Sequence, residues 1–195
     1  MKILIACEFS GTVRDAFSAL GHDVTSCDLL PSETQGKHYQ GSVLDILNDG
    51  WDLMIAHPPC TYLSNAGARH LYPKGVLNKD RFNNGLEAKE FFMALYNADI
   101  PLICVENPIP SKVYELPEYT QSIQPYEHGH PFKKKTCLWL KGLPNLVPTK
   151  IVTERESSKV VGNWFNKGGK DRQKNRAKTF QGIADAMAAQ WGALK

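Results

Sequence analysis

The sequence predicts an α/β fold with a doubly wound, mostly parallel sheet, built as a single domain over residues 1–195. Short apolar runs alternate with stretches whose apolar residues recur at helical spacing, a pattern typical of βαβ units. The length allows one domain with a substantial core and is short for two. Chemically distinctive side chains follow four of the apolar runs, and sheets of this class bind ligands at the carboxyl ends of their strands.

The apolar runs predict five buried strands, at residues 3–7, 23–27, 52–57, 101–106 and 136–140. The third strand ends at the proline pair 58–59, which cannot continue a central strand. We expect a first helix to begin with a capping box at Thr12 to Asp15, because apolar residues at helical spacing follow it. Two further helices are expected around residues 88–95 and 180–191 for the same reason.

The positive charge is concentrated near the end of the chain. The formal net charge is +3, but residues 167–178 hold six basic side chains and one acid and so carry +5. A basic patch on a near-neutral body favours a polyanionic partner such as nucleic acid, and the alternative is a solvated loop. We expect a basic mobile loop at about residues 162–178, since glycines and asparagines precede the basic residues. The candidate nucleic-acid contacts in it are Lys167, Lys170, Arg172, Lys174 and Arg176.

The sequence favours a cytoplasmic protein without a membrane partner. No apolar run approaches the roughly 20 residues that cross a bilayer, and the first residues predict a strand instead of a signal peptide. The five cysteines form no C-x-x-C pair, so neither a zinc site nor a redox dithiol is indicated, and we expect no metal. Four of the cysteines lie in or at the end of apolar runs, as small buried hydrophobes do. The exception is Cys60.

Cys60 is the candidate nucleophile. It ends the run His57–Cys60, in which two prolines fix the backbone just after the third strand. A thiol nucleophile needs a lowered pKa or a positive neighbour, and His57, Arg69 and Lys135 are the candidates to supply it. The alternative is a buried or incidental thiol.

Glu106 is the candidate acid. It ends the apolar strand 102–105, so we expect partial desolvation and a raised pKa, which suits a group that donates a proton near neutrality. Asn107 follows directly and is expected to orient either Glu106 or the substrate. The alternative is a strand-end acid that caps a neighbouring loop.

A nucleoside site is predicted after the first strand. Small residues join that strand to a helix N-terminus, where a ligand can approach backbone amides. Asp28 follows about 20 residues later, at the distance of an acid that binds ribose hydroxyls, and Asp45 is placed to reach an adenine amine. The residues of the turn are Phe9, Ser10, Gly11 and Thr12. The alternative is a tight turn with two helix-capping acids.

These segments together resemble the DNA cytosine-5 methyltransferase family. Its nucleophile lies in a Pro-Cys pair after a strand, as in Pro59-Cys60, and its acid in a Glu-Asn pair after the next core strand, as in Glu106-Asn107. Its first loop, Phe-x-Gly-x-Gly, is matched in part by residues 9–13. The whole chain is more closely similar to short phage and prophage members that lack a separate target-recognition domain. The shared segments are residues 56–60, 105–108, 135–140 and 180–184.

The resemblance implies a Rossmann-like methyltransferase fold, S-adenosylmethionine (AdoMet) as cofactor, and methyl transfer to C5 of cytosine in DNA within the bacterial host cytosol. Cys60 would add to C6 of the ring while Glu106, with Asn107, binds N3 and the exocyclic amine. A base in duplex DNA must first be flipped out of the stack. The implied cofactor contacts are Phe9, Ser10, Gly11, Thr12, Asp28, Asp45 and Pro58. The implied DNA contacts are His57, Lys135, Lys167, Lys170, Arg172, Lys174 and Arg176.

The chain also departs from the family pattern. Val13 replaces the second glycine of the first loop, Pro108 stands where the large enzymes have Val, and their Gln-x-Arg-x-Arg segment is absent. Only residues 141 to about 178 are available for target recognition, too few for a second domain. Three alternatives therefore stay open: C5 modification of a free pyrimidine nucleotide or RNA, methylation of an exocyclic amine, and a non-catalytic phage binding protein on a methyltransferase scaffold.

Overall fold

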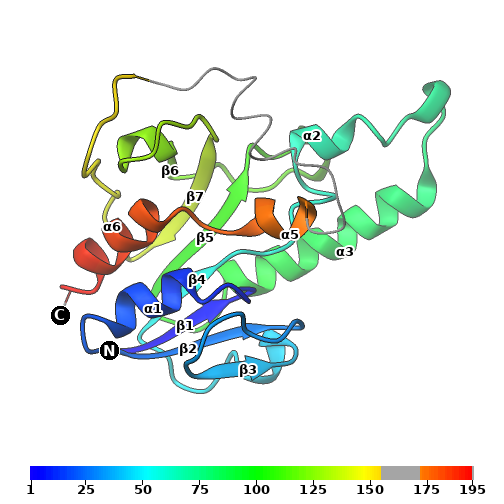
Figure 1. Ribbon diagram of the computed structural model, residues 1–195. Helices are drawn as coiled ribbons and strands as arrows, with labels where there is room; N and C mark the ends of the chain where they lie inside the picture. The colour runs from blue at the N-terminus through cyan, green and yellow to red at the C-terminus, as the bar shows by residue number, and fades with distance from the viewer. Residues whose placement is uncertain (155–171, 195) are drawn as a thin grey trace.

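One seven-stranded sheet organises the chain in the computed structural model, which describes residues 1–154 and 172–194 (Figure 1). The strands are β1 (Lys2–Ala6), β2 (Asp23–Asp28), β3 (His38–Gln40), β4 (Leu53–Ala56), β5 (Leu102–Pro108), β6 (Gln121–Ile123) and β7 (Thr136–Lys141). Their order is β3-β2-β1-β4-β5-β7-β6, and the first five strands all run parallel. Only β7 runs against its neighbours β5 and β6 in this described sheet.

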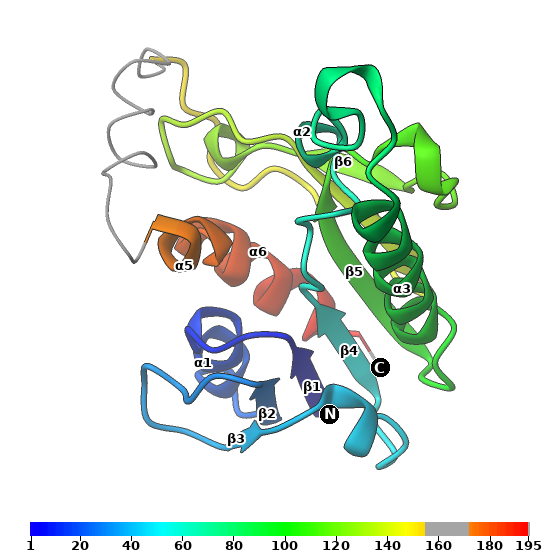
Figure 2. The ribbon, with the colours of Figure 1, turned by 90° about the vertical axis from the view of Figure 1, so that its right-hand side faces the viewer.

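The helices cover both faces of this sheet. They are α1 (Thr12–Ser18), α2 (Asn65–Ala68), α3 (Lys79–Tyr96), α5 (Arg172–Ala177) and α6 (Gln181–Trp191), with short 3-10 turns η1 (Val43–Asp45), η2 (Pro73–Gly75), η3 (Lys112–Tyr114) and η4 (Pro125–Glu127). Helices α1 and α6 pack against each other on one face, and α3 lies on the other (Figure 2). The predicted α/β class with a doubly wound, mostly parallel sheet is therefore confirmed. None of the helices in the described part of the chain is long and apolar enough to span a bilayer.

Strands β1 and β4 and the first part of β5 are almost continuously apolar because both of their faces are buried. In β1, Ile3 and Ile5 join the core beneath α1 and α6, whereas Leu4 joins the core beneath α3. Trp191 of α6 and Trp139 of β7 are each fully buried, one in each core. The two cores cover both faces of the sheet and thereby position its carboxyl edge.

Three features differ from the expectations. Strands β3 and β6 have three residues each and carry too little pattern to be recognised. The expected capping box at Thr12 to Asp15 is wrong, because Gly11 is the N-cap of α1, with φ of 76°, and no side chain of the cap residue bonds to the helix. Part of the expected loop at 162–178 is helical, since α5 spans Arg172–Ala177; residues 155–171 lie outside the described chain.

Truncation of the Phe92 side chain tests the packing of the core beneath α3. Its side chain is fully buried and meets the Trp139 ring edge-on, with 5.0 Å between the ring centroids. We expect Phe92→Ala to lower the free energy of unfolding by about 3–5 kcal/mol, because the truncation leaves a cavity. Chemical denaturation measures this loss. Leu86→Ala on the same helix is the matched control, since Leu86 is 40% exposed, and it should change stability by about 0.5 kcal/mol or less. Equal losses for the two variants would contradict the packing described.

Candidate active site

The candidate site is formed where β1 and β4 end beside β5, which continues to Pro108. Ala6 of β1 is in register with Ala56 of β4, which is in register with Val105 of β5. The residues that follow β1 and β4 therefore lie at the same edge of the sheet as the last residues of β5. The alternation of a strand places Glu106 on the face of α6 and the next residue, Asn107, on the opposite face.

His57 and Glu106 form a hydrogen-bonded ion pair at this edge. Nδ1 of His57 lies 2.8 Å from Oε2 of Glu106, and the two side chains are only 9% and 16% exposed. Burial alone would lower the pKa of His57, but the hydrogen bond to Glu106 and the charges of Glu106 and Glu8 outweigh it and raise that pKa.

The carboxyl of Glu106 is ionised, contrary to the expectation of a raised pKa. Burial does act to raise it, but the hydrogen bond from His57, with the charges of His57 and Lys134, holds the pKa of Glu106 below its usual range. The sequence correctly indicated desolvation and could not reveal the histidine partner, which lies 49 residues away along the chain.

The Cys60 thiol is partly buried and, because its pKa is raised, it is protonated near neutral pH. Burial, and next the negative charge of Glu106, raise the pKa of Cys60, while Lys134 and Arg176 act in the opposite direction. The expected positive neighbours are engaged elsewhere. Lys135 donates to the Tyr119 hydroxyl at 3.4 Å, and the Arg69 guanidinium donates to His70.

Asn107 fixes the turn that carries Cys60. Its Nδ2 donates to the backbone oxygen of Pro58 at 2.9 Å, and Pro58 itself is buried. Within the described chain, Asn107 Oδ1 and His57 Nε2 are buried without a hydrogen-bond partner. Asn107 therefore acts on the backbone of the turn, and Pro58 is part of that anchor.

Lys134 is the basic residue beside Glu106 that sequence reasoning missed. The two line one small pocket together with Thr136, Thr179, Phe180 and Ile183. Nζ of Lys134 donates to the backbone oxygen of Arg176 at 3.1 Å, which joins this segment to α5. In the structure, Glu106 is paired with Leu138 across the sheet, and the alternation of the strand places Lys134 on the same face as Leu138; this register could not be read from the sequence.

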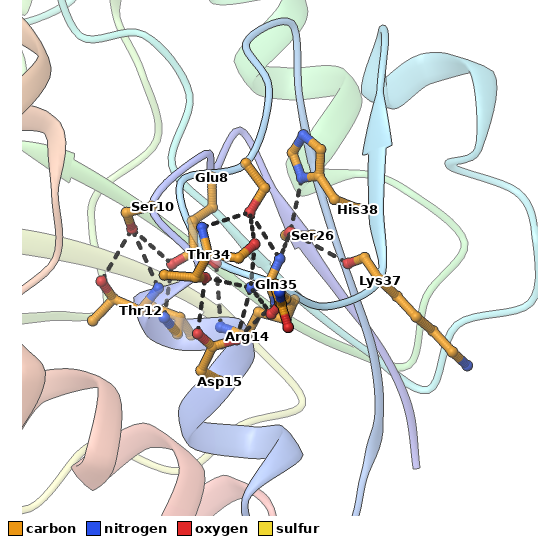
Figure 3. Close-up of polar contacts among 12 residues, drawn as sticks. Glu8, Ser10, Thr12, Arg14, Asp15, Ser26, Thr34, Gln35, Lys37 and His38 are labelled. Carbon is orange, nitrogen blue, oxygen red and sulfur yellow. Dashed lines mark hydrogen bonds and ion pairs between the residues drawn. The ribbon is translucent and has the colours of Figure 1, made fainter.

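Glu8, which directly precedes the turn of Phe9 to Thr12, caps helix α1 (Figure 3). Its buried carboxylate accepts hydrogen bonds from the backbone N–H groups of Val13 at 2.7 Å and Arg14 at 3.2 Å. Ser10 donates to the same carboxylate at 3.3 Å and also to the hydroxyl of Thr12. The amides expected to face a ligand are thus already satisfied by this chain.

Arg14 clamps a second loop over the same turn. Its side chain is 1% exposed, and its guanidinium donates to Ser26, to Ser32 and to the backbone oxygen of Gln35 (Figure 3). The N–H of Glu33 donates to the backbone oxygen of Phe9 at 2.8 Å. Segment 32–35 therefore lies against the turn. The predicted cofactor residues Phe9, Ser10 and Gly11 are buried, and Thr12 is partly exposed.

The two predicted acids of the nucleoside site stay accessible. Asp28 is partly exposed and accepts from the N–H of Leu30 at 2.9 Å, and the exposed Asp45 accepts from the Tyr39 hydroxyl at 3.1 Å. Burial raises the pKa of the Cys27 thiol to about 11, and the charges of Asp28 and Asp45 add to this shift. Both carboxylates therefore lie near the carboxyl end of β2.

Two basic residues of α5 and the segment after it, Lys174 and Lys178, contact the first turn and segment 32–35. Lys174 and Lys178 pair with Glu33 at 2.9 and 2.6 Å, and Nζ of Lys174 lies 5.2 Å from the centre of the Phe9 ring. Arg176 is exposed, and Arg172 begins α5. The predicted contacts Lys167 and Lys170 lie outside the described residues. No cluster of three or more His, Cys, Asp or Glu residues suited to a metal ion occurs in residues 1–154 and 172–194.

No family model and no curated protein matches the sequence. Solved structures that resemble part of this chain include two methyltransferases. One is a putative DNA modification methyltransferase encoded within an Escherichia coli prophage, with 14% identity and a TM-score of 0.47 over 77% of this chain and 51% of that one. The other is the methyltransferase EhMeth of Entamoeba histolytica, with 14% identity and a TM-score of 0.44 over 80% of this chain and 57% of that one.

This chain thus spans about half the length of each of those two proteins. Likenesses of this size do not assign an activity to this chain.

The Arg14 clamp can be tested directly. We expect Arg14→Met to release segment 32–35, because it removes the buried donors that bind Ser32 and Gln35. Backbone amides of that segment should then exchange hydrogen faster, and the protein should lose about 1–3 kcal/mol of unfolding free energy. Hydrogen exchange with mass spectrometry measures the first effect. Lys37→Met is the matched control, since the Lys37–Asp23 pair is exposed. Unchanged exchange in Arg14→Met would contradict the clamp.

Proposed function

We propose that this chain is an AdoMet-dependent methyltransferase that modifies C5 of cytosine in DNA through a covalent bond between Cys60 and C6 of the base. One observation carries the proposal. Cys60 lies in the turn after β4 and Glu106 lies in the neighbouring parallel strand β5, close enough for the charge of Glu106 to act on the thiol. A nucleophile beside an acid is the arrangement that addition to a pyrimidine requires.

Each of these residues has its own role in the proposed reaction. The Cys60 thiol first loses its proton to solvent, since its side chain is partly exposed. Its sulfur then forms a bond to C6, and electron density moves through the ring to N3, beside Glu106. After C5 is methylated, its proton passes to solvent, the C5–H electron pair forms the C5=C6 double bond, and the C6–S bond breaks with its electron pair returning to sulfur. Asn107 keeps the turn in place through Pro58.

The residues present fit part of AdoMet. Asp28 and Asp45 would hold the ribose and adenine groups, and the exposed Leu29, Leu30 and Leu44 beside them offer apolar surface for the ring. AdoMet supplies an electrophilic methyl group when it is bound. The turn at Phe9 to Gly11 fits less well, because segment 32–35 and Glu8 occupy its ligand-facing side.

Positive charge beside the site supports a nucleic-acid substrate. Lys134 lines the pocket of Glu106, and Arg176 is exposed on α5 close enough to influence the Cys60 thiol. Such groups bind phosphates without reading sequence. They would hold the backbone of a strand whose base has entered the site.

The covered first turn favours a second candidate, a binding protein on this scaffold without methyl transfer. Titration calorimetry with AdoMet separates the two candidates. Binding that weakens in Asp28→Ala supports the enzyme. No binding to a folded wild-type chain supports the second candidate.

Covalent trapping tests the role of Cys60. DNA that contains 5-fluorocytosine should form a stable adduct with the wild-type chain and AdoMet, because fluorine blocks the final elimination. We expect Cys60→Ala to form no adduct. The adduct is detected as a band of higher mass in denaturing electrophoresis. Cys104→Ala should still form it, since Cys104 is buried in the core. RNA and free nucleotides run in parallel test the alternative substrates. Methyl transfer by the Cys60→Ala variant would contradict the covalent mechanism.

A further inference from the structure

The geometry points to His57 as the positioning residue of Glu106: it fixes the carboxyl group and supplies the proton that Glu106 passes to ring nitrogen N3. This inference rests on the proposed function and names the chemical class of base that the site accepts. That class is a pyrimidine whose N3 is an unprotonated acceptor, such as cytosine.

The contact is well placed for such a transfer. Nδ1 of His57 and Oε2 of Glu106 are 2.8 Å apart, and both side chains are largely buried. Glu106 also lines the small pocket with Lys134 and Phe180, so its carboxyl borders both the histidine and the space next to it. His57 directly follows β4 and Glu106 lies in β5, two strands whose relative positions are set by the sheet.

The charges around His57 favour its protonated form. Glu106 faces it from β5 and Glu8 from the turn after β1, and both stabilise the imidazolium. Lys134, from the segment before β7, opposes them. Cys60, on the same turn as His57, is held as the neutral thiol and adds no charge. Two carboxylates against one ammonium leave a net attraction for a proton on His57.

The proposed step conserves protons. When the Cys60 sulfur bonds to C6, the Nδ1–H bond of His57 breaks and Oε2 of Glu106 takes the proton. Glu106 gives that proton to N3, so an N3–H bond forms and Glu106 becomes a carboxylate again. His57 ends the step as neutral imidazole. Elimination of Cys60 later returns the N3 proton to the pair. A base that already carries hydrogen at N3, such as uracil, cannot accept this proton at N3.

The ion pair can be tested without any methyl transfer. Histidine-labelled protein is titrated by NMR, with the His57 signal assigned from its loss in His57→Gln. We expect the pKa of His57 to lie above 6.5 in the wild-type chain. In Glu106→Gln the pKa should fall, because burial remains while the principal stabilising charge is gone. An identical His57 titration in the two proteins would overturn the inference.

The proton-donating role is tested by the pH profile of methyl transfer to cytosine DNA. His57 has a raised pKa, so its proton is present at low pH and is lost as pH rises through that value. The wild-type rate should therefore fall on the alkaline side at the pKa that NMR gives. His57→Gln should lose about 10²–10⁴-fold in rate and should lack that alkaline limb, since glutamine keeps a hydrogen-bond donor and has no proton to give.

His70→Gln, at an exposed histidine after the same turn, is the control and should keep the wild-type rate and profile. A His57→Gln protein with the wild-type pH profile would overturn the inference and leave the proposed function standing. A wild-type chain that transfers no methyl group, with the NMR titration as expected, would overturn the proposed function and the proton-donating role together, while the ion pair stands.

Discussion

The buried contact between His57 and Glu106 is the interaction on which the arrangement of the site depends. Removing a charge from water costs several kcal/mol unless an opposite charge and hydrogen bonds replace the water. Each of the two groups therefore keeps its charge because the other is there. The contact also joins the end of β4 to β5, and the bond from Asn107 to Pro58 joins them a second time on the opposite face. The turn that carries Cys60 is held between these two bonds.

The sequence predicted the central strands well because their burial on both faces leaves uninterrupted apolar runs. It also predicted that polar residues after those strands would gather at one edge, since parallel strands share that edge. It could not give the direction of β7, because an apolar run looks the same whichever way the chain enters the sheet. The pKa of Glu106 was wrongly predicted for a related reason. Burial is visible in residues 102–105, but the partner His57 comes from another strand.

The first turn shows how a local signal can mislead. Thr12 to Asp15 has the spacing of a capping box, yet Gly11 is the cap residue and the capping carboxylate is that of Glu8, which precedes the turn. Arg14 looks like a solvated residue on a helix of mixed character. It is buried because loop residues 18 to 21 positions later fold over it. Contacts between loops leave no periodic pattern, so this part of the site could be learned only from the structure.

The same carboxylate links the two reacting groups of the proposed site. The charge of Glu106 is one cause of the raised pKa of Cys60, so a site that keeps Glu106 ionised also keeps the thiol protonated. Transfer of a proton from His57 to Glu106 neutralises that charge. The thiolate is then less strongly disfavoured at the moment when Glu106 can donate to N3. In the proposed reaction, one proton movement therefore readies the acid and removes the contribution of Glu106 to the raised pKa of the thiol, while the larger contribution of burial remains.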